Sequence, residues 1–206
     1  LPVGFINAAV GGSSIESWLN QAPFSRGEHY ETMIIPFVGY GLRGVVWYQG
    51  ESNQLNGRAY LPKLRSLIHG WRDVWGQGEF SFYYVQLAAI GESPVDNPAG
   101  GDGRAGIRQA QFEALAISNT GMSVAIDIGD KREHPPNKFD TGMRLARWAL
   151  HHDYDKKDLV PSGPIYKSCK IEGEKIRILF DYAQNGLMLA SKEGYAPPVP
   201  TSAPVT

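Results

Sequence analysis

The 206-residue sequence carries 20 Lys and Arg against 21 Asp and Glu, a net charge of −1 that speaks against nucleic acid or an anionic membrane as a partner. Its longest apolar stretches, such as residues 82–90, reach only about half of the roughly 20 residues that a membrane-spanning helix needs. With 42% hydrophobic residues, the chain is long enough to bury the core of one globular domain.

The N-terminal elements begin with a short apolar run. Residues 3–10 are predicted to form a buried strand that leaves through the turn at Gly11 and Gly12. A helix should follow, because residues 13–16 have the S-x-x-E spacing of a capping box. A second helix is expected over residues 30–38, with an interruption at Pro36, and a strand over residues 44–49. Since the chain opens inside an apolar run, we expect a further segment to precede it.

The middle of the chain alternates helices and strands. Apolar residues at helical spacing predict a helix over residues 58–74, followed by a strand over 80–89 and a long Gly/Pro/Asp loop over 91–103. The remaining elements of this region are a helix over residues 107–117, a strand over 122–128 and a helix over 137–152. This order and the apolar strands predict an α/β fold with a mainly parallel sheet, covered by helices on both faces. Ligands bind at the carboxyl ends of such strands.

The pattern changes after residue 152. We place the end of the α/β domain at residue 155 and assign residues 156–195 to a β-rich region. Residues 165–171 and 175–181 should form a β-hairpin, because they flank Glu172-Gly173-Glu174. Residues 196–206 are rich in Pro, Ser and Thr and are predicted to be a linker or a disordered tail.

Unusual polar residues follow three of the predicted strands. The Gly11-Gly12 turn precedes a helix and could direct backbone N–H groups at an oxyanion, although a turn required by helix packing explains it equally well. Gln49 could supply a side-chain donor, supported by Glu51 and Asn53, or these residues could cap their own loop. His134 precedes two prolines that would fix its backbone; a surface histidine is the alternative.

The spacing of the cysteine and the histidines indicates whether the chain could bind a metal ion. Cys169 has no second cysteine to pair with, and the histidines show no i, i+4 pair and no Cys/His cluster. We therefore expect no metal site and no cofactor. A nucleotide-binding role is disfavoured, because no P-loop lysine and no G-x-G-x-x-G follow a strand. The histidines are His29, His69, His134, His151 and His152.

Three blocks of the sequence together resemble one enzyme family. Residues 4–18, the Trp-Tyr-Gln-Gly-Glu-Ser-Asn block at 47–53, and residues 127–146 are similar, in order and spacing, to the sialate O-acetylesterase family of the SGNH-hydrolase superfamily. Residues 162–173 resemble the start of the β-rich segment that follows the esterase domain in that family. Related xylan acetylesterases share these blocks. The resemblance implies a three-layer α/β/α, flavodoxin-like fold and serine-histidine acyl transfer on O-acetylated sialic acid or plant polysaccharide.

The resemblance also implies roles for individual residues. His134 matches the catalytic histidine, Gly12 or its neighbour Gly11 the backbone oxyanion donor, and Gln49 the side-chain donor. Arg108 and Gln111 match a segment near the substrate mouth, unless they belong to a solvated helix face. Asp130 is the expected acid that orients His134; Asp127 is the alternative, as is a dyad without any carboxylate.

One part of the family pattern is missing. The nucleophile of the family lies in a Gly-Gln-Ser-Asn block upstream of the first strand, and the sequence contains no such block. Ser13 and Ser14 are poor substitutes, because Gly-Gly-Ser-Ser-Ile lacks the second glycine of a nucleophile elbow. We expect a preceding segment or a second chain to supply the serine. The rival interpretation is a binding module that holds a glycan without turnover. The resemblance implies an extracellular, periplasmic or lysosomal location.

Overall fold

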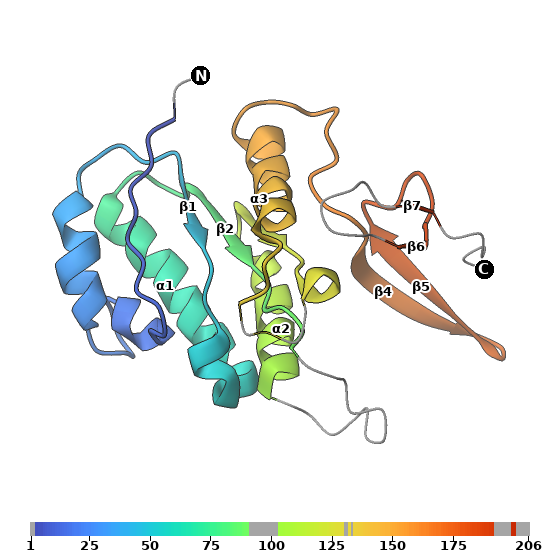
Figure 1. The fold of residues 1–206 in the computed structure, drawn as a ribbon, viewed down its shortest axis with the longest axis horizontal. Helices are drawn as coiled ribbons and strands as arrows, with labels where there is room; N and C mark the ends of the chain where they lie inside the picture. The colour runs from blue at the N-terminus through green and yellow to red at the C-terminus, as the bar shows by residue number, and fades with distance from the viewer. Residues whose placement is uncertain (1–2, 91–102, 130–131, 133, 192–198, 201–206) are drawn as a thin grey trace.

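The computed structural model describes residues 3–90, 103–129, 132, 134–191 and 199–200, and Figure 1 shows the arrangement of the elements. Among these residues, none of the helices has the length and apolar character needed to cross a membrane. The predicted loop 91–103 falls outside the described part except for its last residue, and so does Asp130.

A three-stranded parallel sheet forms the centre of the α/β part. Its strands are β1 (Gly44–Trp47), β2 (Ser81–Val85) and β3 (Thr120–Ser123), in the order β1-β2-β3. All five residues of β2 are buried, as expected for the central strand of a sheet covered on both faces. The fold class predicted from the alternating elements is thereby confirmed.

Helices cover both faces of this sheet. Helices α1 (Tyr60–Trp75) and α2 (Gly103–Glu113) connect consecutive strands, so right-handed crossovers bring them to the same face. Phe82 and Tyr84 of β2 belong to the apolar core on that side. Helix α3 (Lys138–His152) lies against the opposite face, where the indole nitrogen of Trp148 donates to the carbonyl of Met122 over 3.0 Å. The result is a three-layer α/β/α arrangement.

Short helical segments connect these elements. In the described part of the chain these segments are five 3-10 helices and one π-helix, η2. They are η1 (Ile15–Trp18), η2 (Tyr30–Ile34), η3 (Ile35–Phe37), η4 (Glu51–Ala59), η5 (Ala114–Ala116) and η6 (Ile126–Ile128). The strand predicted over 122–128 is therefore shorter than expected, because residues 126–128 form η6.

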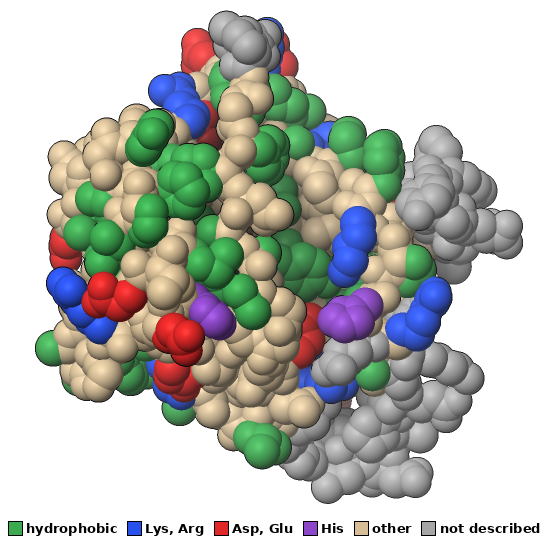
Figure 2. All heavy atoms as spheres, turned by 60° about the vertical axis from the view of Figure 1, so that its left-hand side comes forward, with side chains coloured by type: hydrophobic (Ala, Val, Ile, Leu, Met, Phe, Trp, Pro, Cys, Tyr) green, Lys and Arg blue, Asp and Glu red, His purple; other side chains and the backbone are tan. Residues whose placement is uncertain are grey.

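The predicted first strand is wrong. Residues 3–10 have no regular structure, and Phe5 is 89% exposed although its neighbours suggested burial. Figure 2 shows exposed hydrophobic side chains on the side of the molecule that carries this segment, and Val46 of β1 is exposed as well. A strand requires a hydrogen-bonding partner, and among the described residues β1 pairs only with β2.

The predicted capping box is also wrong. Ser14 rather than Ser13 is the N-cap of η1, and its side chain makes no capping hydrogen bond. The hydroxyl of Ser13 instead donates to the carbonyl of Val10 over 2.8 Å and accepts from the indole of Trp18 over 3.0 Å. Glu16 is consequently free to extend toward the loop after β1.

The C-terminal region forms the predicted hairpin. Strands β4 (Ile165–Glu172) and β5 (Lys175–Asp181) pair antiparallel, and β6 (Ala190–Ser191) pairs with β7 (Val199–Pro200). Tyr166 contacts Phe112 of α2, with 6.5 Å between the ring centroids. The domain boundary near residue 155 stays a prediction, and of the predicted tail 196–206 the structure describes only β7.

Candidate functional site

The side chain of Gln49 lies just beyond the carboxyl end of β1 and is 8% exposed. Its oxygen accepts a hydrogen bond from the hydroxyl of Tyr60 over 2.8 Å. Its nitrogen donates to the side-chain oxygen of Asn53 over 2.8 Å and to the backbone carbonyl of Ser13 over 3.0 Å. The amide is therefore held on both sides, and one of its N–H groups is directed at the carbonyl of Ser13, in the segment that follows the Gly-Gly turn.

Asn53 connects this loop to the N-terminal segment. Its side chain is 3% exposed, and its oxygen also accepts from the backbone N–H of Ile15 over 2.8 Å. Its nitrogen donates to a carboxylate oxygen of Glu16 over 2.8 Å and to Asn56 over 3.0 Å. Ser52 adds a further connection, because its hydroxyl donates to the carbonyl of Gly12 over 2.9 Å. The turn and the Gln49 loop, 36 or more residues apart in sequence, thus lie side by side.

An ion pair closes this network at one end. The ammonium of Lys63, in the first turn of α1, binds the carboxylate of Glu16 and the side-chain oxygen of Asn56. Partial burial by itself would raise the pKa of Glu16, but the hydrogen bonds from Lys63 and Asn53 outweigh it and lower the pKa to about 2. Glu16 therefore carries its charge throughout the neutral pH range.

The Gly11-Gly12 turn retains free donors. Gly12 has a φ of 73°, in the left-handed region that favours glycine. Among the residues that the structure describes, the backbone N–H groups of Gly11 and Gly12 have no hydrogen-bond partner. Both residues are exposed, so these N–H groups can donate to a ligand that approaches the turn.

His134 is exposed, and described residues on either side of it contact the ends of strands. Before it, Gly129 approaches the backbone of Ala89 beyond β2 so closely that a Cβ would lie 2.3 Å from the Ala89 carbonyl oxygen. After it, the ammonium of Lys138 lies 4.6 Å from the ring centroid of Tyr48, the residue next to β1. Both contacts lie at the carboxyl ends of strands, on the same rim as Gln49.

One ion pair bears on which carboxylate could orient His134. Both carboxylate oxygens of Asp127 accept hydrogen bonds from the guanidinium of Arg144, each over 2.6 Å. Asp127, the alternative to Asp130, is thus engaged with α3. Asp130 itself lies outside the described residues, and its assignment stays a prediction.

Gln111 lies beside the Gln49 loop in the interior of the protein, where its side-chain nitrogen donates to the backbone carbonyl of Gln49 over 3.4 Å. The side chain of Gln111 is 1% exposed; its oxygen accepts from the N–H of Leu87 over 2.8 Å, and its nitrogen donates to the carbonyl of Val85 over 3.0 Å. It stabilises the backbone that follows β1 and β2, and its amide is buried. Its role at the substrate mouth stays a prediction. Arg108 is half-buried on the same helix, α2.

Glu51 and Tyr60 complete the loop after β1. Glu51 begins η4 and is half-buried. The burial of Tyr48, together with the negative charge of Glu51 nearby, raises the pKa of Tyr48 to about 12. Tyr60 is fully buried at the start of α1. Sequence reasoning missed Tyr60, Lys63 and Ser52, because a tyrosine at helical spacing indicates a core residue and a lysine or serine a solvated one.

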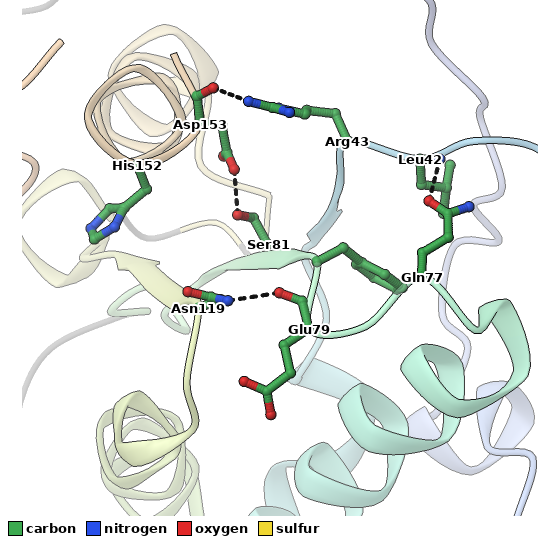
Figure 3. A pocket seen from close by; sticks show the side chains of 9 residues that line it. Leu42, Arg43, Gln77, Glu79, Ser81, Asn119, His152 and Asp153 are labelled. Atoms are coloured by element: carbon green, nitrogen blue, oxygen red, sulfur yellow. Dashed lines mark hydrogen bonds between the residues drawn. The ribbon is translucent and has the colours of Figure 1, made fainter. Parts of the chain in front are cut away.

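A pocket of about 360 Å³ lies on the opposite rim, at the amino ends of the strands. Figure 3 shows its lining, in which Asp153 accepts from the hydroxyl of Ser81 over 2.6 Å and its backbone carbonyl accepts from Arg43. Asn119 donates to the backbone carbonyl of Glu79 over 2.7 Å. These polar groups satisfy one another, and none of the predicted site residues lies among them.

Comparisons with known proteins agree on one family. A family model described as carbohydrate esterase, sialic acid-specific acetylesterase, matches residues 1–151. The human sialate O-acetylesterase is 28% identical over 222 residues, which cover 89% of this chain and 42% of that protein. The mouse protein is 33% identical over 178 residues, covering 77% of this chain and 30% of the relative.

A solved structure is similar over nearly the whole chain. It is a carbohydrate acetylesterase from Xanthomonas citri, with a TM-score of 0.73 and 31% identity. The match covers 95% of this chain and 49% of that one. The chain thus spans less than half the length of these relatives.

Proposed function

Because the chain belongs to the sialic acid-specific acetylesterase family of carbohydrate esterases, we propose that it forms the oxyanion-binding and proton-transfer part of a site that hydrolyses acetyl esters on sugars. The observation that carries this proposal is the hydrogen bonding between the Gln49 loop and the residues around the Gly-Gly turn. It brings an oriented side-chain amide and free backbone N–H groups to one rim of a parallel sheet, where such folds bind ligands.

The oxyanion is stabilised by Gln49 and the turn. The Ser13 carbonyl oxygen, 3.0 Å from the nitrogen of Gln49, marks a position at which an oxygen accepts from this amide. In the complex, the acyl oxygen takes over that N–H as negative charge develops on it. The backbone N–H of Gly12, with Gly11 as the alternative, supplies the second donor. Two such donors, fixed before the reaction, stabilise a tetrahedral intermediate more than its neutral precursor.

The nucleophile comes from outside these 206 residues. The hydroxyl of Ser13 is already bound to Val10 and Trp18, which leaves it unsuited to attack a carbonyl. The family resemblance assigns the nucleophile to a Gly-Gln-Ser-Asn block, and we propose that a preceding segment or a second polypeptide supplies it. The exposed apolar side chains of residues 3–10 and of Val46 would be covered by that segment.

His134 transfers the proton in both half-reactions. It takes the proton of the serine hydroxyl as the serine oxygen bonds to the acetyl carbon, and returns it to the sugar oxygen as the ester bond breaks. A water molecule then attacks the acetyl-serine with His134 again as the base, which releases acetate and restores the serine. Asp130 is proposed to hold the imidazole in the required orientation.

The test is complementation. The chain is combined with a polypeptide that carries the Gly-Gln-Ser-Asn segment, and acetate release is measured from O-acetylated sialic acid and from acetylated xylan. His134→Ala should lower kcat/KM roughly 10³-fold or more. The matched control is His69→Ala, an exposed histidine on α1 that should leave the rate unchanged.

A second candidate function is glycan binding without turnover. It is favoured by one observation: both N–H groups of Gln49 already have partners within the chain. Retained glycan binding with no acetate release from the complemented protein would establish this alternative. A normal rate in His134→Ala would remove His134 from the proposed mechanism.

A further inference from the structure

The direction of the Gln49 amide is determined by groups that can only donate or only accept. An ammonium and an indole N–H can only donate, and a carboxylate can only accept. Amides and hydroxyls between such groups must orient to match them. The network around Gln49 begins and ends on groups of this kind, so its hydrogen-bond directions follow from chemistry alone.

One branch runs from α1 to Gln49 through Glu16. Lys63 donates to one oxygen of the Glu16 carboxylate, and the other oxygen accepts from Asn53 over 2.8 Å. Asn53 must therefore place its nitrogen toward Glu16 and its oxygen on the opposite side. That oxygen accepts from the N–H of Ile15 and from the nitrogen of Gln49.

The other branch reaches Gln49 from the core. The indole N–H of Trp47 donates to the hydroxyl of Tyr60 over 3.3 Å, and that hydroxyl lies 2.8 Å from the side-chain oxygen and 3.2 Å from the backbone oxygen of Gln49. The contact with Tyr60 agrees with the direction that Asn53 imposes: the side-chain oxygen of Gln49 faces Tyr60, and its N–H groups face Asn53 and Ser13.

We propose that Glu16 is a positioning residue, which acts through Asn53 to fix the direction in which Gln49 presents its N–H groups to the acyl oxygen. This inference rests on the oxyanion role proposed for Gln49. Glu16 does not touch the substrate; its carboxylate matters because it accepts two hydrogen bonds at once, one from Lys63 and one from Asn53.

Replacing the carboxylate by an amide removes this ability. In Glu16→Gln the single side-chain oxygen can serve Lys63 or Asn53, and the amide nitrogen then faces a donor at the other position. Since the charged ammonium is the stronger donor, the oxygen turns to Lys63, and the nitrogen of Asn53 then faces another donor. Removing the ammonium as well, in the double variant Glu16→Gln with Lys63→Met, frees the oxygen for Asn53. A purely structural ion pair would show no such rescue.

The first measurement uses this chain alone. In ¹H–¹⁵N spectra, the side-chain NH₂ signals of Gln49 and Asn53 report the hydrogen bonds of these amides directly. Glu16→Gln should shift both pairs of signals and speed the exchange of their protons with water, and the double variant should restore the native positions. Glu31→Gln, which removes the ion pair with Arg26 elsewhere, is the matched control and should shift neither.

The second measurement uses the complemented protein. Glu16→Gln should lower kcat about tenfold or more while KM stays nearly constant, because a misdirected donor weakens the transition state more than substrate binding. The double variant should recover most of the loss, and Glu31→Gln should retain full activity. If Glu16→Gln fails to fold, the amide signals of Lys63→Met, which keeps the carboxylate, should remain at their native positions.

Two outcomes would overturn the inference. One is a Glu16→Gln protein whose Gln49 signals and kcat are those of the unchanged chain. The other is a double variant whose amide signals and kcat are as strongly changed as those of Glu16→Gln, because loss of the ion pair alone would then explain the effect. Complemented wild-type protein without any turnover would instead count against the proposed function, and the NMR arm would still decide on the role of Glu16.

Discussion

The guanidinium of Arg144 binds both carboxylate oxygens of Asp127, and its Nη1 also donates to the carbonyl of Val124. The pairing connects α3 to η6, the 3-10 turn after β3. Because both oxygens of Asp127 are bound to a cation that remains charged at every accessible pH, we expect another group to orient the imidazole of His134.

Asp127→Asn should therefore leave esterase turnover unchanged in the complemented protein. The lost ion pair is about half exposed on its acidic side, so the free energy of unfolding should fall by only about 1 kcal/mol or less. Asp130→Asn is the comparison and should lower kcat strongly if Asp130 orients His134. Equal rates in both variants would support a dyad without a carboxylate.

Gln111→Ala should destabilise the chain by about 2 to 3 kcal/mol in urea denaturation. The change leaves the buried N–H of Leu87 and the carbonyl of Val85 without their partner. Gln109→Ala on the same helix is the control: its side chain is exposed, and the cost should stay within about 0.5 kcal/mol. If Gln111→Ala left the free energy of unfolding unchanged and only raised KM, Gln111 would instead act at the substrate mouth.

Gly12→Ala should cost about 1 to 2 kcal/mol, because a Cβ is strained at a φ of 73° even though the space around it is open. Gly11→Ala has the same open space without the positive φ and should stay within about 0.5 kcal/mol. Thermal unfolding of the two variants side by side measures the difference. Equal melting temperatures would show that the turn adopts another conformation in solution.

The stability of the chain should fall as the pH drops from about 4.5 to about 2. Hydrogen bonds from Lys63 and Asn53 lower the pKa of Glu16 from 4.5 to about 2, against the effect of burial. A depressed carboxyl pKa stabilises the folded state above the unfolded pKa, and the benefit is lost as the folded pKa is approached. In Glu16→Gln this part of the pH dependence should be absent, as urea titrations at several pH values would show.

The elements of the α/β core could be predicted because their apolar periodicity is long and regular. The helix predicted over 58–74 is α1 at Tyr60–Trp75, and the strand predicted over 80–89 contains β2 at Ser81–Val85. Residues 3–10 show the limit of the same reasoning. A run of apolar, β-branched residues indicates a segment that would gain from burial, but strand formation depends on a neighbour that the run does not reveal.

The sequence predicts only part of the candidate site. It singles out Gln49 and Asn53 because polar residues follow an apolar strand, and that signal is local. Glu16 was assigned to a cap from its spacing to Ser13, whereas its carboxylate binds Asn53, 37 residues away in sequence. Pairings over such distances depend on how the turn and the loop pack together, which single-sequence spacing does not encode.

The unpaired edge of β1 has a practical consequence. Gly44 and Val46 are exposed, and among the described strands only β2 pairs with β1, so the outer backbone groups of β1 can recruit a strand from another molecule. Concentrated preparations of the isolated chain should self-associate through this edge. Co-expression with a segment that occupies it should yield more monodisperse protein, which light scattering would detect before any assay of turnover.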